Sequence, residues 1–177
     1  MSRKKWFNSS FSRVVVCFVC MQILLACSAS ADCPDVTLTG LDNEQHKVCE
    51  YIGAGKWTVV NIWGPKCPAC IEEIPELVDF HDSHYDKDAT VLGIALDFPS
   101  YGYAKHDDVA KVVDDYLVEY PNLLSDGEVA AKLGAKPLRG TPTTLIFNRN
   151  GSLVLEHVGI ITTSEIEEVI SQHVVNK

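Results

Sequence analysis

Basic side chains are scarce in this chain of 177 residues. It carries 15 lysines and arginines against 24 aspartates and glutamates, which gives a formal net charge of −9. Residues 1–31 hold four of the basic residues and no acidic residue, so the remainder carries 11 − 24 = −13. Nucleic-acid binding requires a concentrated basic surface. The composition therefore argues against a nucleic-acid partner.

The N-terminus lacks an apolar run long enough for an ordinary membrane span. The mostly apolar stretch from Val14 to Ala26 has 13 residues, whereas a spanning helix needs about 20. It follows basic residues at positions 3–5 and precedes the small residues 28–31, a pattern typical of an export signal. We expect residues 1–31 to be a signal peptide and residues 32–177 to form one domain. That domain would lie in the periplasm or at the extracytoplasmic face of the membrane.

The end of the signal is compatible with two processing routes. Ala29-Ser30-Ala31 before Asp32 fits ordinary signal-peptidase cleavage. Leu24-Leu25-Ala26-Cys27 resembles a bacterial lipobox, in which Cys27 would become the lipidated first residue of an anchored lipoprotein. An uncleaved anchor is a third interpretation. All three place the domain outside the cytoplasm.

Two of the seven cysteines form a C-x-x-C pair in an informative context. Cys67 and Cys70 follow the β-branched segment 58–62 and precede a helix that begins at Ile71. Backbone N–H groups and the macrodipole at a helix start favour negative charge, so the first cysteine can be a stabilised thiolate. The pair can also close a small disulfide. This context predicts dithiol redox chemistry.

The other cysteines divide between the signal and the domain. A second C-x-x-C, Cys17 and Cys20, lies inside the apolar run and would be removed with it. Cys33 and Cys49 flank an expected hairpin, and an oxidising compartment makes a structural disulfide between them reasonable. Such a bridge would stabilise the fold by roughly 3 kcal/mol. Two free thiols are the alternative.

The remaining pattern predicts a single α/β domain with no internal repeat. Strands and helices alternate and then end in a hairpin with an Asn-Gly turn and a closing helix, which favours a mixed sheet covered by helices on both faces. The expected strands are 36–39, 46–49, 57–62, 90–96, 122–124, 143–147 and 152–156. The expected helices follow Cys70 and span 107–118, 128–133 and about 166–174.

This order of elements resembles the thioredoxin fold, specifically the exported TlpA/ResA-like thiol-disulfide oxidoreductases. The resemblance spans nearly all of residues 34–175. It is carried by Trp63-x-x-x-Cys67-x-x-Cys70 and by Thr141-Pro142-Thr143-Thr144. Further matches are Pro34-Asp35-Val36-Thr37-Leu38, Val59-Val60-Asn61-Ile62, Glu73-Ile74-Pro75-Glu76-Leu77 and Leu145-Ile146.

The resemblance implies roles for several residues and no cofactor. Pro142 would be cis and face the dithiol, which would let the Thr141 backbone pair with a bound polypeptide. Asn61 stands where cytoplasmic thioredoxins have a buried aspartate. Glu73 matches the acidic residue that the group keeps near its cysteines and would take over proton handling. A solvated glutamate on the helix surface is the alternative.

One segment departs from the family pattern. Gly64-Pro65-Lys66 stands where the family commonly shows Ala-x-Trp. A cation beside the nucleophile should favour the Cys67 thiolate. We expect Trp63, Lys66 and Thr141 to contact the substrate.

The predicted function is reduction of disulfides in envelope proteins. Cys67, as an exposed nucleophile, would attack the partner disulfide, and Cys70 would resolve the mixed disulfide. A membrane-embedded electron donor would then restore the dithiol. Apocytochrome c is one substrate that the resemblance implies. The oligomeric state stays open.

Four alternatives remain. A disulfide-donating oxidase of the same fold would need Cys67 with a very low pKa. A zinc or copper site would need Cys67, Cys70 and two more ligands. A partner-binding module would leave its thiols idle. A peroxidase would need threonine where Gly64 stands. His81 and His84 are expected to be surface residues.

Overall fold

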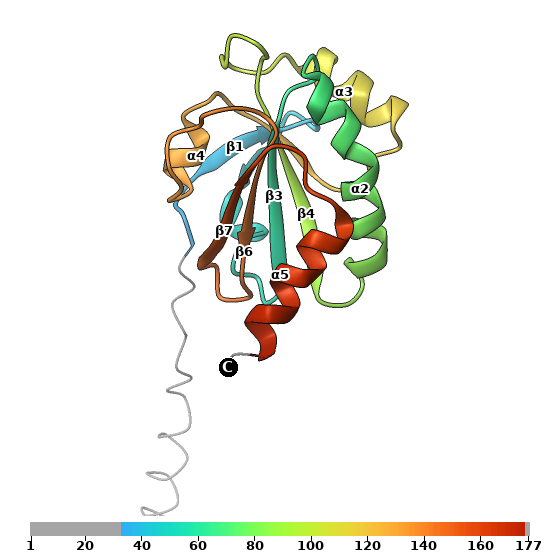
Figure 1. Ribbon diagram of the computed structural model, residues 1–177. Helices are drawn as coiled ribbons and strands as arrows, with labels where there is room; N and C mark the ends of the chain where they lie inside the picture. Colours follow the sequence, from blue (N-terminus) through green and yellow to red (C-terminus); the bar gives the residue numbers. More distant parts are fainter. Residues whose placement is uncertain (1–32, 176–177) are drawn as a thin grey trace, which may run out of the picture. The chain divides into compact units, whose positions relative to one another are not determined.

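The computed structural model describes residues 33–175, so the expected signal peptide and Cys17, Cys20 and Cys27 lie outside the described residues. Seven strands form one mixed sheet in the order β2-β1-β5-β4-β3-β6-β7 (Figure 1). The strands are β1 (Thr37–Gly40), β2 (Gln45–Lys47), β3 (Trp57–Trp63), β4 (Ala89–Ala95), β5 (Asn122–Leu124), β6 (Thr143–Phe147) and β7 (Leu153–Val158). The helices are η1 (Val48–Glu50), α2 (Pro68–His84), α3 (His106–Asp115), α4 (Val129–Lys132) and α5 (Thr163–Val175).

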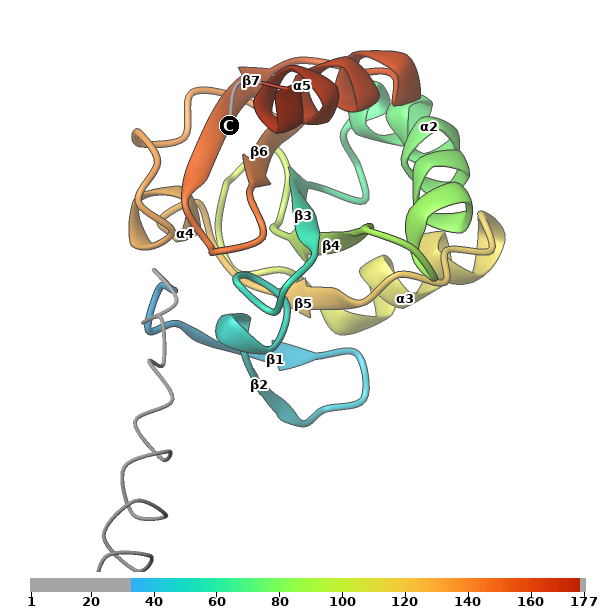
Figure 2. The ribbon, with the colours of Figure 1, turned by 90° about the horizontal axis from the view of Figure 1, so that it is seen from below.

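The centre of the sheet is parallel and its flanks are antiparallel. β3, β4 and β5 run parallel and are joined by the crossover helices α2 and α3. Because such crossovers are right-handed and the strands follow in one direction, both helices lie on the same face of the sheet. Seen from below, α5, α2 and α3 follow one another along that face, and α4 lies across the sheet from them (Figure 2). The thioredoxin-like architecture expected from the sequence is confirmed.

Alternation along β3 divides the core between the two faces. All seven β3 residues are buried, and successive side chains point to opposite sides of a strand. Trp57 and Val59 pack in a cluster with α2 and α5. Val60 and Ile62 pack in a second cluster that includes residues of η1 and α4. Both faces of β3 are therefore covered, and its carboxyl end leads directly into the C-x-x-C segment.

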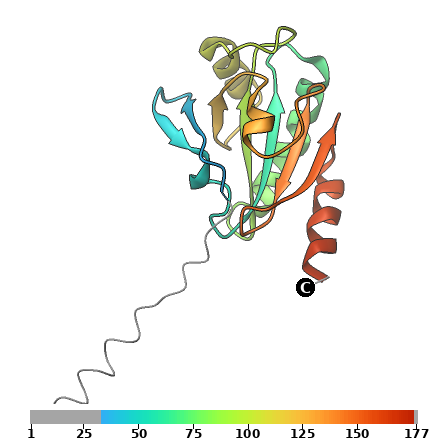
Figure 3. The same ribbon diagram turned by 90° about the vertical axis from the view of Figure 1, so that its left-hand side faces the viewer.

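The N-terminal hairpin forms one edge of the sheet (Figure 3). β1 pairs with β2 and, on its other side, with β5, antiparallel in both cases. Cys33 and Cys49 are joined by a disulfide with a Cα–Cα distance of 5.5 Å. Cys49 lies in the short helix η1 and not in the expected strand 46–49. The bridge ties the segment before β1 to the segment after β2.

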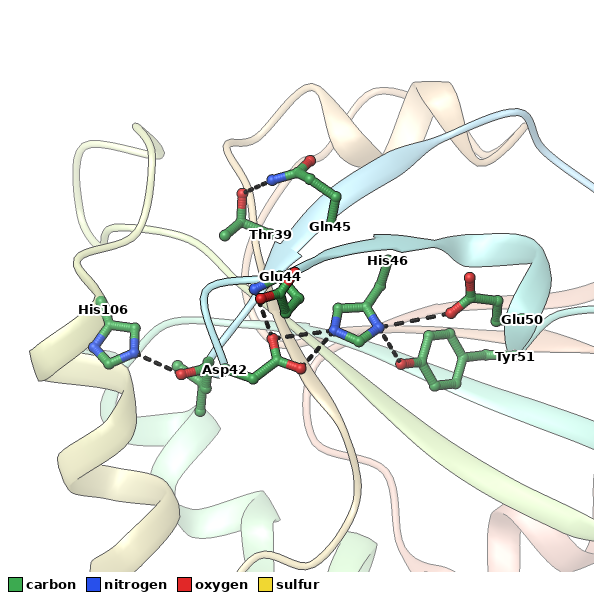
Figure 4. A network of polar contacts seen from close by, with 9 residues as sticks. Thr39, Asp42, Glu44, Gln45, His46, Glu50, Tyr51 and His106 are labelled. Carbon is green, nitrogen blue, oxygen red and sulfur yellow. Dashed lines mark hydrogen bonds and ion pairs between the residues drawn. The ribbon is translucent and has the colours of Figure 1, made fainter.

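A histidine holds the hairpin turn through polar contacts (Figure 4). Nε2 of His46 lies 2.8 Å from a carboxylate oxygen of Asp42 in the turn. Nδ1 of the same ring lies 3.6 Å from Glu50 and 3.3 Å from the Tyr51 hydroxyl. The hydrogen bond to Asp42 raises the pKa of His46 above its usual value. These contacts link the turn to η1.

Two expectations for the helices are corrected. The predicted helix 107–118 ends at Asp115, and Leu117, expected on its apolar stripe, has a φ of 53° and is 78% exposed. His81 is buried instead of lying at the surface, and its Nδ1 accepts a hydrogen bond from the Val91 N–H. Within residues 33–175, no helix has the length and apolar character needed to cross a membrane.

Candidate active site

Three chain segments meet at the carboxyl end of β3. α2 begins only a few residues after this strand, with Pro68 in its first turn. β6 runs antiparallel to β3, and Ile62 pairs with Thr143. The residues just before β6 therefore lie beside the start of α2. The Thr141–Pro142 peptide bond, which occupies this place, is cis.

Cys67 and Cys70 form a disulfide at the start of α2, with a Cα–Cα distance of 5.2 Å. Cys67 is the residue that caps the helix, and its Sγ accepts a hydrogen bond from the Cys70 N–H at 3.2 Å. The Thr141 hydroxyl lies 3.5 Å from Cys67 Sγ, and the Thr141 carbonyl oxygen lies 3.6 Å from it. Two donors therefore face this sulfur. They suit a sulfur that carries negative charge after reduction.

Neither cysteine is freely exposed in this oxidised form. Cys67 is 2% exposed and Cys70 is 1% exposed, and both belong to the hydrophobic cluster that contains Trp63 and Ile74. This differs from the expectation of an exposed Cys67. The reason is that both cysteines pack in this apolar cluster, which also includes residues of β4 and α3. The residues on either side of Cys67, Lys66 and Pro68, are exposed, and Thr141 beside it is partly buried.

Glu73 is buried, which rules out a solvated position on the helix surface. It is 0% exposed. Its carboxylate accepts a hydrogen bond from Asn61 Nδ2 at 2.6 Å and another from the Ile161 N–H at 2.9 Å. Burial raises the pKa of Glu73 to about 7, although the two hydrogen bonds oppose that shift. A carboxyl group one helical turn after Cys70 thus changes charge near neutral pH.

Trp63 lies in the core and not on a substrate-binding surface. It is 3% exposed, and its indole N–H donates to Asn122 Oδ1 at 3.0 Å. Space for this pair comes from Gly93, since a Cβ there would lie 2.0 Å from Asn122 Oδ1. The predicted contact between Trp63 and substrate is therefore not supported. Asn122 had no local signal in the sequence, because its partner lies on another strand.

Lys66 is half exposed and has acidic partners from two other segments. Its Nζ lies 2.6 Å from Asp108 Oδ2 on α3 and 4.0 Å from Asp97 Oδ1 after β4. The Asp108 contact raises the pKa of Lys66. The sequence predicted a single cation beside Cys67. The structure shows instead a lysine paired with two carboxylates, and Lys105 is a further cation that acts on Asp108, so the charge of Lys66 is offset.

The described residues are not arranged as a metal site or as a peroxidase site would require. Among residues 33–175, no three His, Cys, Asp or Glu side chains are grouped so that they could hold a metal ion. A Cβ at Gly64 would lie 2.8 Å from Phe98 Cβ. A threonine at this position, which a peroxidase would need, therefore requires Phe98 to shift.

A helix-capping dithiol beside a cis-proline loop, on a thioredoxin-like sheet, defines the thiol-disulfide oxidoreductase class of proteins. The chain belongs to the AhpC/TSA family, whose model matches residues 29–155. It is similar to the thiol-disulfide oxidoreductase ResA of Halalkalibacterium halodurans, with 27% identity over 132 residues, 74% of this chain and 69% of the relative. ResA of Geobacillus thermodenitrificans is 25% identical over 149 residues, 84% of this chain and 77% of the relative.

Solved structures agree with this assignment. The crystal structure of a DsbF homologue from Corynebacterium diphtheriae matches with a TM-score of 0.67 and 25% identity, covering 79% of this chain and 85% of that one. A thioredoxin-family thiol:disulfide interchange protein from Chlorobium tepidum shares the fold, with a TM-score of 0.66, 19% identity and 79% and 93% coverage. The protein is thus a ResA/TlpA-like thiol-disulfide oxidoreductase of the thioredoxin superfamily.

Proposed function

We propose that this protein is exported and reduces disulfides in envelope proteins through Cys67 and Cys70. The observation that supports this most directly is the position of Cys67 Sγ, which faces the Cys70 N–H and the Thr141 hydroxyl. Those donors stabilise a thiolate, which is the attacking form of the cysteine. Apocytochrome c is one candidate substrate. Within residues 33–175, no group of His, Cys, Asp and Glu side chains supports a metal-binding role.

The reaction proceeds by two exchanges. The Cys67 thiolate attacks one sulfur of the partner disulfide, which forms a mixed disulfide and releases the other partner sulfur as a thiolate. Cys70 loses its proton and attacks Cys67 Sγ, which releases the second partner thiol and leaves the Cys67–Cys70 disulfide. Two electrons have then passed to the partner. A membrane-embedded dithiol donor returns them.

Two other residues complete this scheme. Glu73 accepts the Cys70 proton, since its carboxyl group is buried on α2 one turn after Cys70 and has a pKa of about 7. The Thr141 backbone pairs with the partner chain, since its carbonyl oxygen already lies 3.6 Å from Cys67 Sγ. Each substrate-facing group thus belongs to the segment around the cis bond or to the start of α2.

A trapping experiment tests this proposal. In the Cys70→Ser variant, the mixed disulfide cannot be resolved, so the variant should accumulate covalent adducts with envelope proteins that disappear under a reductant. The Cys67→Ser variant should form none. If Cys70→Ser produces no more adducts than Cys67→Ser in the host envelope, the reductase proposal is wrong.

A further inference from the structure

Lys66, which immediately precedes the nucleophile, is the only residue of the C-x-x-C segment that is tied to another element by an ion pair within the described residues. Asp108 holds its ammonium group from the first turn of α3, at 2.6 Å. Asp97 approaches from the segment that follows β4, at 4.0 Å. The three side chains carry a formal net charge of −1, and Lys105 is a further cation that acts on Asp108 without an ion-pair contact to it.

We propose that Asp108, assisted by Asp97, is a positioning residue that neutralises Lys66 and thereby keeps the Cys67–Cys70 couple reducing. This inference rests on the proposed function. A free cation at position 66 would stabilise the Cys67 thiolate and so favour the reduced protein, which makes the couple a better oxidant. The carboxylates of Asp108 and Asp97 offset the field of that cation. The reduced protein then gives up its electrons more readily.

A neighbouring carboxylate, that of Asp107, takes no part in the ion pair with Lys66. Asp107, the neighbouring residue on α3, is fully exposed and pairs with His106, not with Lys66. Its carboxylate belongs to the same helix turn but lies on a different side of it. Asp107→Asn is therefore a matched control, because it removes one charge from the same turn without changing the charge around Lys66.

The test measures the equilibrium constant for reduction of the Cys67–Cys70 disulfide by a glutathione or dithiothreitol buffer. Asp108→Asn leaves Lys66 with one carboxylate, so the constant should rise at least threefold, which is about 14 mV at about 30 mV per tenfold. Lys66→Gln leaves two carboxylates without a cation, so the constant should fall. The Lys66→Gln/Asp108→Asn double variant restores a net charge of −1 and should return toward the wild-type value. Asp107→Asn should leave it unchanged.

Opposite changes of the equilibrium constant in Asp108→Asn and Lys66→Gln distinguish this inference from a purely structural role of the ion pair. If the pair only fixed the active-site segment, Asp108→Asn and Lys66→Gln would each break it and shift the constant in the same direction or not at all. Either result would overturn the inference. A second readout is the pH dependence of Cys67 alkylation, which should show a lower thiol pKa in Asp108→Asn. At 1 M salt, where charges are screened beyond about 3 Å, both shifts should shrink.

Failure here differs from failure of the proposed function. A Cys70→Ser variant that traps no mixed disulfide refutes the reductase, whatever the charge variants do. If Cys70→Ser does trap adducts but Asp108→Asn has the same equilibrium constant as Asp107→Asn, only the role of Asp108 is refuted.

Discussion

At the scale of single residues, the site depends on side chains that the sequence pattern predicts unequally well. The motif predicted Cys67, Cys70 and the Thr141–Pro142 pair, because each stands next to a recognisable strand or helix start. Asn122 and Asp108 could not be identified in this way, since each acts on a residue from a different element. The assignment of Trp63 as a substrate contact failed because both faces of β3 are covered, so neither side of this strand is open to a partner.

Glu73 should make stability depend on pH. Because burial raises its pKa from 4.5 to about 7, the folded protein favours the neutral form. The neutral carboxyl group does not destabilise the folded state below pH 4.5. As the pH rises to 7, the free energy of unfolding falls by about 3 kcal/mol, because Glu73 ionises more easily in the unfolded chain. Relative to wild type, Glu73→Gln should therefore gain about that amount in free energy of unfolding between pH 4.5 and 7.5. Denaturant titrations at both values measure it.

The control for this prediction is Glu72→Gln. Glu72 is exposed on the preceding position of α2, so its substitution should leave the difference from wild type the same at both pH values. If the free energy of unfolding of Glu73→Gln also differs from that of wild type by the same amount at both pH values, Glu73 ionises with its ordinary pKa in the folded protein.

Gly93 should be intolerant of a side chain. Its Cβ would lie 2.0 Å from Asn122 Oδ1 and 3.2 Å from Trp63 Nε1. Gly93→Ala should lower the free energy of unfolding by about 1–3 kcal/mol, because a packed interior resists added volume. Gly140→Ala serves as the comparison, since its Cβ would meet only Val158 at 3.5 Å. Equal stabilities of the two variants in urea would show that the Trp63–Asn122 pair moves freely.

At the scale of elements, the sequence predicted the existence and type of nearly every segment but not where each ends. A β-branched segment identified β3, a continuous apolar run identified β4, and helical spacing of apolar residues identified α3, because burial determines those patterns. The end of α3 was missed because Leu117 continues the apolar spacing beyond Asp115 while its backbone turns out of the helix. When only spacing is considered, an apolar residue in a turn cannot be distinguished from one on the apolar face of a helix.

The bridge at the hairpin edge should stabilise the domain without affecting the dithiol. Cys33 and Cys49 close a loop of 16 residues. Replacing both by serine should lower the free energy of unfolding by about 3 kcal/mol, because the unfolded chain regains its freedom. The reduction potential of Cys67 and Cys70 should stay the same. A changed potential would show that the hairpin and the dithiol are coupled, while unchanged stability would show that the bridge does not constrain the unfolded chain.

At the scale of the whole molecule, the topology explains why these residues converge. A parallel β3-α2-β4 unit places the dithiol at the carboxyl end of β3, and the antiparallel β6 brings the Thr141–Pro142 bond to the same edge of the sheet. The resemblance to a family predicted this architecture correctly. It could not predict the charge around Lys66, because that charge depends on which acidic residues α3 turns toward the site.

The most direct test of the account is the reduction potential of the Cys67–Cys70 couple in the purified protein. The protein would be equilibrated with defined thiol buffers, and Cys33 and Cys49 would be monitored separately. A reductase with a neutralised Lys66 should have a potential near that of thioredoxin, about −270 mV. A value near that of DsbA, about −120 mV, would contradict the account and identify the protein as a disulfide donor.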